Sequence, residues 1–418
     1  MSSALSSSAL LSSGGAFNDA LTARQGQTPI DMAELRRYRQ GSGAPAATLE
    51  SVTRKARRLT LNWSDGRTGQ FPMMWLRDHC ACDQCRHPLT RERLYKLLDD
   101  PLWERLDGDD ALASFAFDAN ALTLAWQDGH VSRFDAGWLH QRCPGQELAT
   151  LLPTPKPWPT HFTPSRVSHA DFVDGSDGRS RWATALLRDG LVILDQGPCE
   201  LEEVSRIAES IGPMRSTNFG GRFDVRSVPN PNNAAYTAIG LELHTDLPNW
   251  RQPPDIQLLY CLENDAEGGE SSFADGFAAA ETLRAGDPEA FRILAETPID
   301  FRFQDDGHDI AVREPVIDLD GEGRPREIRF NNWIRDTLSL PSDRIEAWYD
   351  AYRALWQILR RPEGRVELTL EPGQMVAFDN RRVLHGRNAF DPNTGKRHLQ
   401  GTYLDLDMLQ SHLRVLSR

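Results

Sequence analysis

The alternation of apolar and polar positions predicts short strands early in the chain. The run Leu59-Thr-Leu-Asn-Trp63 alternates with period two and is followed by Asp65-Gly66, a dipeptide typical of a tight hairpin turn. The preceding segment is rich in Ser, Ala and Gly and shows no such period. We therefore expect residues 1–47 to form a disordered tail and residues 48–150 to form a small β-rich domain.

The small domain carries an internal repeat. The pattern Leu-Thr-Leu-x-Trp-x-Asp-Gly at residues 59–66 returns at 122–129, and the same offset of 63 residues carries Cys80 onto Cys143. So many coincidences at one offset predict two similar β-hairpins packed in one domain.

A proline cluster separates this domain from a longer one. Five of the twelve residues from Pro153 to Pro164 are proline, which predicts a stiff linker over 151–165. Residues 166–418 then alternate short apolar runs with helical periods. The expected helices are 178–189, 201–211, 276–285, 288–296, 343–360 and one after 404; the expected strands are 190–195, 256–261, 299–304, 309–318, 326–331, 397–404 and a pair around Pro372-Gly373. This pattern indicates a mostly β, α+β fold: a double-stranded β-helix, or jelly roll, with flanking helices.

Composition and charge narrow the choice of partners. The 418 residues include 47 basic and 60 acidic side chains, a net charge of −13, which argues against nucleic acid or an anionic membrane as a partner. No apolar run approaches the roughly 18 residues of a membrane span. The N-terminal segment lacks the basic start of a secretory signal, so it is expected to be a disordered tail or a transit peptide. We expect the protein to be cytoplasmic.

The cysteines indicate a metal site. Three of the six lie within six residues: Cys80, Cys82 and Cys85. Without a secretory signal this clustering favours metal over disulfides, and a structural zinc needs a fourth ligand. His79 and His87 are too close in sequence to complete a tetrahedron without strain. We predict His130, which would join the cysteine loop to the second hairpin, with Cys143 as the alternative.

An H-x-D pair and a distant histidine have the ligand content of an iron site. His244 and Asp246 are expected at the end of a strand and His385 in a loop far downstream. Two neutral imidazoles and a carboxylate form the facial triad that holds Fe(II) and leaves adjacent positions open. H-x-D alone is weak, but Gly268-Gly-Glu-Ser271 follows the pair, and Arg397 comes twelve residues after His385. Together these residues resemble the 2-oxoglutarate-dependent oxygenases of the taurine-dioxygenase superfamily.

This resemblance implies roles for further residues. The far carboxylate of 2-oxoglutarate needs a buried cation with fork geometry, which suits Arg397, and Ser271 is placed to add a hydroxyl. Leu259 would complete the cosubstrate site. The implied reaction is oxidative decarboxylation of 2-oxoglutarate to succinate and CO2 with hydroxylation of a substrate carbon, with ascorbate as reductant.

The resemblance extends over residues 50–415 to the γ-butyrobetaine hydroxylase family, with trimethyllysine dioxygenase as a relative. The matching segments are Leu76–Cys85, Asn232–Thr237, His244–Pro248, Phe330–Asn332, Phe378–Asn380, Leu384–Arg387 and Arg397–Gly401. The resemblance implies a homodimer that hydroxylates the quaternary ammonium carboxylate γ-butyrobetaine to L-carnitine. A trimethylammonium group cannot donate hydrogen bonds, so aromatic faces must recognise it. The positions of the family's cage hold Phe219, Phe223, Tyr236 and Tyr403, and those that hold the substrate carboxylate are Asn233 and Asn331.

Two departures from the family leave the substrate open. Phe219 and Phe223 stand where the animal enzymes have Tyr or Trp, and Leu247 replaces a tyrosine. Alternative substrates are therefore trimethyllysine and 2-trimethylaminoethylphosphonate; a phosphonate would favour extra basic residues such as Arg222 or Arg335 near the asparagines. A third hypothesis is a non-catalytic binding protein with a zinc module, against which the intact triad and arginine argue.

Overall fold

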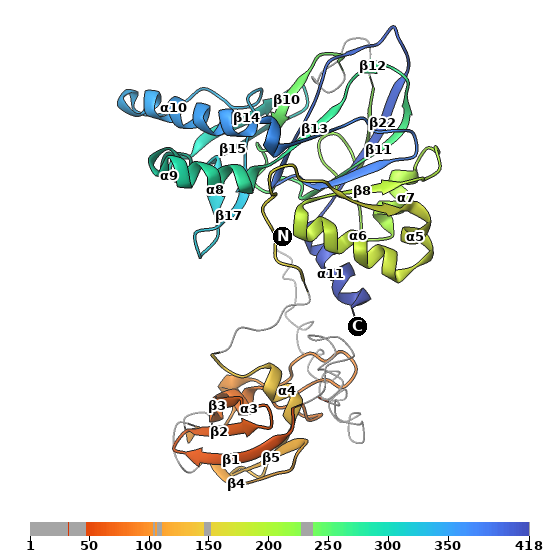
Figure 1. Cartoon of the computed structure of the whole chain (residues 1–418). Coiled ribbons are helices and arrows are strands. Elements are labelled where there is room, and N and C mark those ends of the chain that lie inside the picture. The colour runs from red at the N-terminus through yellow and green to blue at the C-terminus, as the bar shows by residue number, and fades with distance from the viewer. Residues whose placement is uncertain are drawn as a thin grey trace, which may run out of the picture. The chain divides into compact units, whose positions relative to one another are not determined.

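The computed structural model describes Met32 and residues 47–102, 105–106, 111–145, 152–226 and 237–417. The chain forms two compact units, Met1–Leu151 and Leu152–Ser417 (Figure 1). The predicted tail lies outside the described residues apart from Met32 and Ala47, and the four-part division of the chain stays a prediction. No helix in the described ranges has both the length and the apolar character that a membrane crossing needs.

The first unit contains the predicted repeat twice. Each copy is a three-stranded antiparallel sheet followed by a short helix: β1 (Leu49–Lys55), β2 (Arg58–Trp63), β3 (Thr68–Pro72) and α3 (Met73–Asp78), then β4 (Leu112–Phe117), β5 (Ala121–Trp126), β6 (Val131–Asp135) and α4 (Ala136–Gln141). A 3-10 turn, Leu97–Asp99, lies between them. The registers match at the offset of 63, because Leu49 pairs with Trp63 and Leu112 with Trp126. Both copies contribute to one apolar core, so the predicted repeat is confirmed.

The second unit is built on two sheets. The larger has the order β7-β8-β19-β11-β22-β9, and the smaller has the order β10-β20-β13-β18. The larger sheet's strands are Ser165–Ser168, Leu191–Asp195, Met375–Asp379, Ile256–Asn264, Arg397–Leu404 and Arg222–Val225; the smaller sheet's strands are Leu241–His244, Val383–Arg387, Ser271–Asp275 and Arg365–Leu368. All the pairings in both sheets are antiparallel except that of β7 with β8.

Strand periodicity divides the larger sheet into two faces. Ile256, Leu258 and Tyr260 of β11 pack into the core that contains residues of α6, α7 and α11, whereas Cys261 packs into the core between the sheets. That inner core joins Phe378 of the larger sheet to Phe273 of the smaller, with ring centroids 5.4 Å apart. Two sheets that share an inner core form the expected jelly roll.

Helices cover the outer faces (Figure 1). The helices that pack on the larger sheet or on one another there are α5 (His169–Asp174), α6 (Ser176–Asp189), α7 (Glu203–Glu209) and α11 (Leu406–Leu416). A second layer comprises α8 (Gly276–Gly286), α9 (Pro288–Glu296) and α10 (Ser342–Leu359), beside the hairpins β14 (Ile299–Gln304) with β15 (Asp309–Glu314) and β16 (Ile317–Leu319) with β17 (Pro325–Ile328). The remaining elements are the strand pair β12 (Glu267–Gly268) with β21 (Phe390–Asp391) and a 3-10 turn, Pro362–Gly364.

Three expectations about elements are corrected. The strands on either side of Pro372-Gly373 do not pair, because β18 joins the smaller sheet and β19 the larger. His385 lies within strand β20 rather than in a loop. The expected strand 309–318 is interrupted, since β15 ends at Glu314, before Pro315, whose ring removes a backbone donor.

The proline segment is fastened to the second unit. Trp158 donates its backbone N–H to Asp275 and its indole N–H to the carbonyl of Asp189. Arg382 donates to the carbonyl of Lys156 and forms a buried ion pair with Asp275. These contacts fix residues 156–158 to the end of β13, to the end of α6 and to Arg382, the residue before β20.

Candidate functional site

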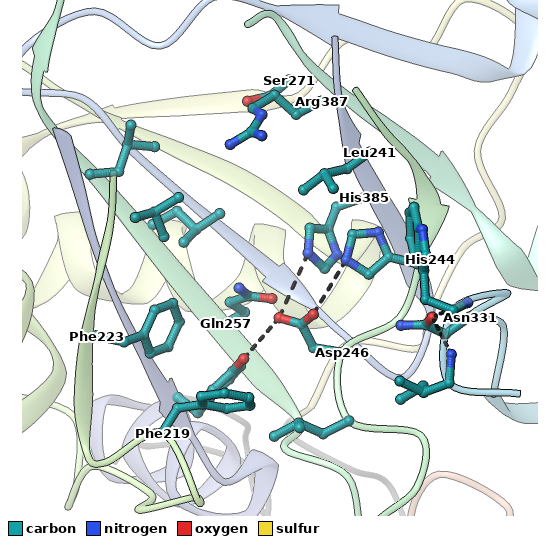
Figure 2. Close-up of a pocket in the computed structure, with 18 of the residues that line it drawn as sticks. Phe219, Phe223, Leu241, His244, Asp246, Gln257, Ser271, Asn331, His385 and Arg387 are labelled. Carbon is teal, nitrogen blue, oxygen red and sulfur yellow. Dashed lines mark hydrogen bonds and ion pairs between the residues drawn. The ribbon is translucent and has the colours of Figure 1, made fainter. Parts of the chain in front are cut away.

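A cavity of about 280 Å³ opens between the two sheets. The larger sheet contributes Gln257 and Leu259 from β11, and the smaller sheet contributes His385 from β20. Figure 2 shows Gln257 and His385 beside Asp246 in this cavity. Every predicted iron, cosubstrate and substrate residue within the described ranges lines this cavity: Phe219, Phe223, His244, Asp246, Leu259, Ser271, Asn331, His385, Arg397 and Tyr403.

The two histidines are brought together by strand pairing. His244, the last residue of β10, lies directly opposite His385 of β20, and their ring centroids are 4.3 Å apart. Asp246 lies two residues beyond the strand. Its Oδ1 is 3.4 Å from His244 Nε2 and its Oδ2 is 3.7 Å from His385 Nε2 (Figure 2). One ligand atom from each residue lies within 4.8 Å of the others, a separation suited to a single metal ion.

Neighbouring groups orient these ligands. The Nδ1 of His244 donates to the carbonyl of Glu242 at 2.8 Å, which leaves Nε2 unprotonated and turned to the site. The buried side chain of Asn380 holds the Asp246 backbone at both ends: its Oδ1 accepts from the N–H at 2.7 Å and its Nδ2 donates to the carbonyl at 3.0 Å. The Tyr403 hydroxyl donates to Asp246 Oδ2 at 2.8 Å.

The protonation states of His385 and Asp246 favour binding of a cation. Burial lowers the pKa of His385 to about 3, so the His385 imidazole is neutral at physiological pH. Burial by itself would raise the pKa of Asp246, but His385, His244 and the hydrogen bond from Tyr403 hold it below its usual range. Two neutral imidazoles and a carboxylate are the ligand set that binds a divalent iron ion.

Two arginine side chains, Arg397 and Arg387, line the same cavity. Nε and Nη1 of Arg397 are buried, and neither has a hydrogen-bond partner among the described residues. Burial lowers the pKa of Arg397. Arg387 lies nearby, and the guanidinium carbons of Arg397 and Arg387 are 5.5 and 5.0 Å from the Phe390 ring centroid. A buried guanidinium with unused donors fits a carboxylate ligand, and the Ser271 hydroxyl lines the same cavity.

The other part of the cavity is aromatic. Phe223 packs on Tyr403 with ring centroids 5.2 Å apart, and Phe219 packs edge-to-face on Phe303 at 5.7 Å. Asn331 lines the cavity, donates to the Thr245 carbonyl, and accepts backbone N–H groups through its Oδ1. The predicted substrate residues Asn233 and Tyr236 lie outside the described residues.

Several cavity residues were missed from the sequence. They are Val225, Leu241, Asn249, Gln257, Phe303, Trp333, Ile334, Gly386, Arg387 and Leu399, whereas Leu247, singled out as a departure from the family, does line the cavity. Period-two alternation from Leu259 would have indicated Gln257, whose buried Oε1 has no partner in the described part of the chain. Trp333, 45% exposed, lies edge-on to His244 at 5.2 Å from a loop, where no periodic signal points to it.

The first unit contains a second candidate metal centre. The Sγ atoms of Cys80, Cys82 and Cys85 lie 3.3, 3.6 and 3.6 Å from His130 Nε2. Ligand atoms of all four lie within 4.8 Å of one another, and Cys143 is not among them. Hydrogen bonds from Cys82 and Cys85 lower the pKa of the Cys80 thiol. Three sulfurs and one imidazole nitrogen form the donor set of a closed zinc site.

Comparisons with known proteins agree with this geometry. The profile described as "Taurine catabolism dioxygenase TauD, TfdA family" matches residues 154–403, and "Gamma-butyrobetaine hydroxylase-like, N-terminal" matches residues 51–101. The chain belongs to the TauD/TfdA dioxygenase family. Like its relatives, this TauD/TfdA member is an Fe(II)- and 2-oxoglutarate-dependent dioxygenase, so the hypothesis of a non-catalytic binding protein was wrong.

The curated relatives of this TauD/TfdA dioxygenase match nearly full-length. "Gamma-butyrobetaine dioxygenase" of Pseudomonas sp. (strain AK-1) is 40% identical over 88% of this chain and 96% of its own length. The protein of that name from Homo sapiens is 32% identical over 85% and 93%. "Trimethyllysine dioxygenase, mitochondrial" of Homo sapiens is 30% identical over 83% of each chain.

Proposed function

We propose that the protein hydroxylates γ-butyrobetaine to L-carnitine, consuming O2 and 2-oxoglutarate and releasing succinate and CO2. The observation that carries the proposal is one cavity with three features: an iron-type triad, a buried arginine with two nitrogens that lack a hydrogen-bond partner among the described residues, and an aromatic wall. The relatives named gamma-butyrobetaine dioxygenase, at 40% and 32% identity, support this substrate over that of the 30% identical trimethyllysine dioxygenase.

In this proposal His244, Asp246 and His385 hold Fe(II), and the metal with O2 and 2-oxoglutarate supplies the oxidative decarboxylation and the oxidising power for hydroxylation. Arg397 binds the far carboxylate of 2-oxoglutarate through its unused donors, aided by the Ser271 hydroxyl. Leu259, on the inner face of β11, packs against the hydrocarbon part of the cosubstrate and excludes water.

The aromatic wall receives the trimethylammonium group. Phe219, Phe223 and Tyr403 line this wall, and Tyr236 of the segment outside the described residues is proposed to complete the cage. The Asn331 amide, with Asn233, holds the substrate carboxylate. The only Asn331 donor bond among those described is the one to Thr245, and its Nδ2 carries two hydrogens.

The anion end of the cavity speaks against a phosphonate substrate. Arg222 is ion-paired with Glu202, and Arg335 lies over the rings of Trp348 and Tyr352. Neither arginine is among the described residues that line the cavity. The extra basic groups that a doubly charged anion would favour are therefore engaged elsewhere.

We further propose a structural zinc held by Cys80, Cys82, Cys85 and His130, ascorbate as the reductant, a homodimer and a cytoplasmic location. The zinc proposal is supported by the geometry of the cluster. The matching N-terminal profile, residues 51–101, covers the three cysteines but ends before His130.

The test is succinate formation with Fe(II), ascorbate and 2-oxoglutarate. γ-Butyrobetaine, trimethyllysine and 2-trimethylaminoethylphosphonate are compared in parallel, with product mass recorded. We expect the highest kcat/KM with γ-butyrobetaine and a product heavier by one oxygen atom. Higher kcat/KM with either other substrate would overturn the proposed substrate while leaving the iron site in place.

A further inference from the structure

Tyr403 contacts both halves of the cavity. Its ring packs against Phe223 in the aromatic wall, and its hydroxyl donates to Oδ2 of Asp246. The side chain is 3% exposed, so water does not compete strongly for this hydrogen bond. A member of the substrate cage thus directly touches a residue of the metal triad.

The position of Tyr403 follows from the register of β22. Arg397, Leu399, Gly401 and Tyr403 are spaced by two residues, so they face the inside of the jelly roll together. Tyr403 is paired across the sheet with Gln257 of β11. Its backbone carbonyl also accepts from the N–H of Arg215 at 2.8 Å. These backbone contacts fix the position of the Tyr403 hydroxyl beside Asp246.

The hydrogen bond restricts what the Asp246 carboxylate can do. One lone pair of Oδ2 is taken by the hydroxyl, and the backbone on either side is held by Asn380. A carboxylate fixed in this way has fewer ways to rotate or to bind a metal through both oxygens. Partners of metal ligands commonly contribute about 10- to 100-fold to metal affinity or activity.

We propose that Tyr403 is a positioning residue for the iron carboxylate and transmits substrate binding to it. The hydroxyl sets the orientation of Asp246, and the ring forms the wall against which the substrate cation rests. The role of the ring in transmitting substrate binding rests on the proposed function. A cation on the ring holds Tyr403 against Phe223 and so keeps the hydroxyl on Asp246 when 2-oxoglutarate is consumed.

Tyr403→Phe separates the two roles, because it removes the hydroxyl and keeps the ring. We expect about 10-fold weaker binding of Co(II), titrated in the absence of substrate, with altered visible absorption bands. We also expect less hydroxylated product per 2-oxoglutarate consumed, while the substrate KM changes less than about threefold because the ring remains.

Phe223→Leu is the matched control. It removes an aromatic face from the same wall and leaves the hydroxyl in place, so we expect a higher substrate KM and parental Co(II) affinity. Circular dichroism verifies the fold of both variants. Parental Co(II) affinity and spectrum in Tyr403→Phe would overturn the proposal, as would equal losses of Co(II) affinity in both variants. The Co(II) titration uses no substrate, so it decides the role of the hydroxyl even if γ-butyrobetaine proves not to be turned over.

Discussion

Substitution of Arg397 is expected to weaken cosubstrate binding without lowering the stability of the fold. Its buried Nε and Nη1 have no hydrogen-bond partner within the described part of the chain, and burial lowers its pKa. The folded protein therefore gains little from this charge and bears its desolvation. Arg397→Met is expected to leave the melting temperature unchanged or raise it, because a similar apolar volume replaces a buried cation with two nitrogens that lack a hydrogen-bond partner among the described residues.

The same substitution should damage cosubstrate binding severely. Removing one partner of a buried ion pair costs about 3–5 kcal/mol, since the remaining charge stays buried and unpaired. With 1.4 kcal/mol per factor of ten, the Kd for 2-oxoglutarate should rise by at least roughly 100-fold. Arg397→Lys keeps the charge but lacks the fork, and its loss should be smaller.

The assay combines calorimetric titration of 2-oxoglutarate into Co(II)-loaded protein with thermal unfolding. Arg387→Met is the contrasting variant, because Arg387 donates to the carbonyls of Thr237 and Ile239 and its loss should lower the melting temperature. A rise in Kd of less than tenfold for Arg397→Met, or a fall in its melting temperature equal to that of Arg387→Met, would refute the reasoning.

Three further variants test other parts of the molecule. Cys80→Ser should release the zinc proposed for the first unit, whereas Cys143→Ser should retain it, because only Cys80 lies in the four-residue cluster. Elemental analysis of zinc per chain tests this, and equal loss in both variants would contradict the proposed ligand set. Gly401→Ala would place a Cβ 2.4 Å from the Phe223 ring, so we expect a stability loss of about 1–3 kcal/mol in denaturant unfolding, and unchanged stability would show that the wall can move. Phe219→Leu should raise the KM for γ-butyrobetaine by roughly 3- to 30-fold with kcat nearly constant, and a fall in kcat alone would place Phe219 outside the head-group site.

Local sequence signals predicted much of the second unit. The helical spacing of apolar residues predicted α6, α8, α9 and α10 to within about two residues, because each of these helices buries one apolar face. The H-x-D motif and its distance from His385 and Arg397 predicted residues that the fold brings to one cavity. Repeats and motifs succeed where the chemistry needs a fixed residue type at a fixed spacing.

The failures have a common physical cause: they depend on contacts that are remote in sequence. Pro372-Gly373 has the chemistry of a hairpin turn, but the chain crosses there from one sheet to the other, which only sheet packing decides. Phe303 and Trp333 reach the cavity from a hairpin and a loop outside the jelly roll. Asn380 is 134 residues from the Asp246 backbone to which it hydrogen-bonds, and no local sequence pattern predicts that contact.

Both sheets position the residues of the triad, but they hold the two histidines and Asp246 in different ways. His244 and His385 face each other across one antiparallel pair of the smaller sheet, so strand pairing alone sets their separation. Asp246 lies outside any strand and is held by Asn380, just after β19, and by Tyr403 of β22, both elements of the larger sheet. A change in the spacing of the sheets would therefore move the carboxylate relative to the imidazoles before it separated the imidazoles from each other. The packing of Phe273 on Phe378 between the sheets consequently supports the proposed metal site, although neither ring lines the cavity among the residues described.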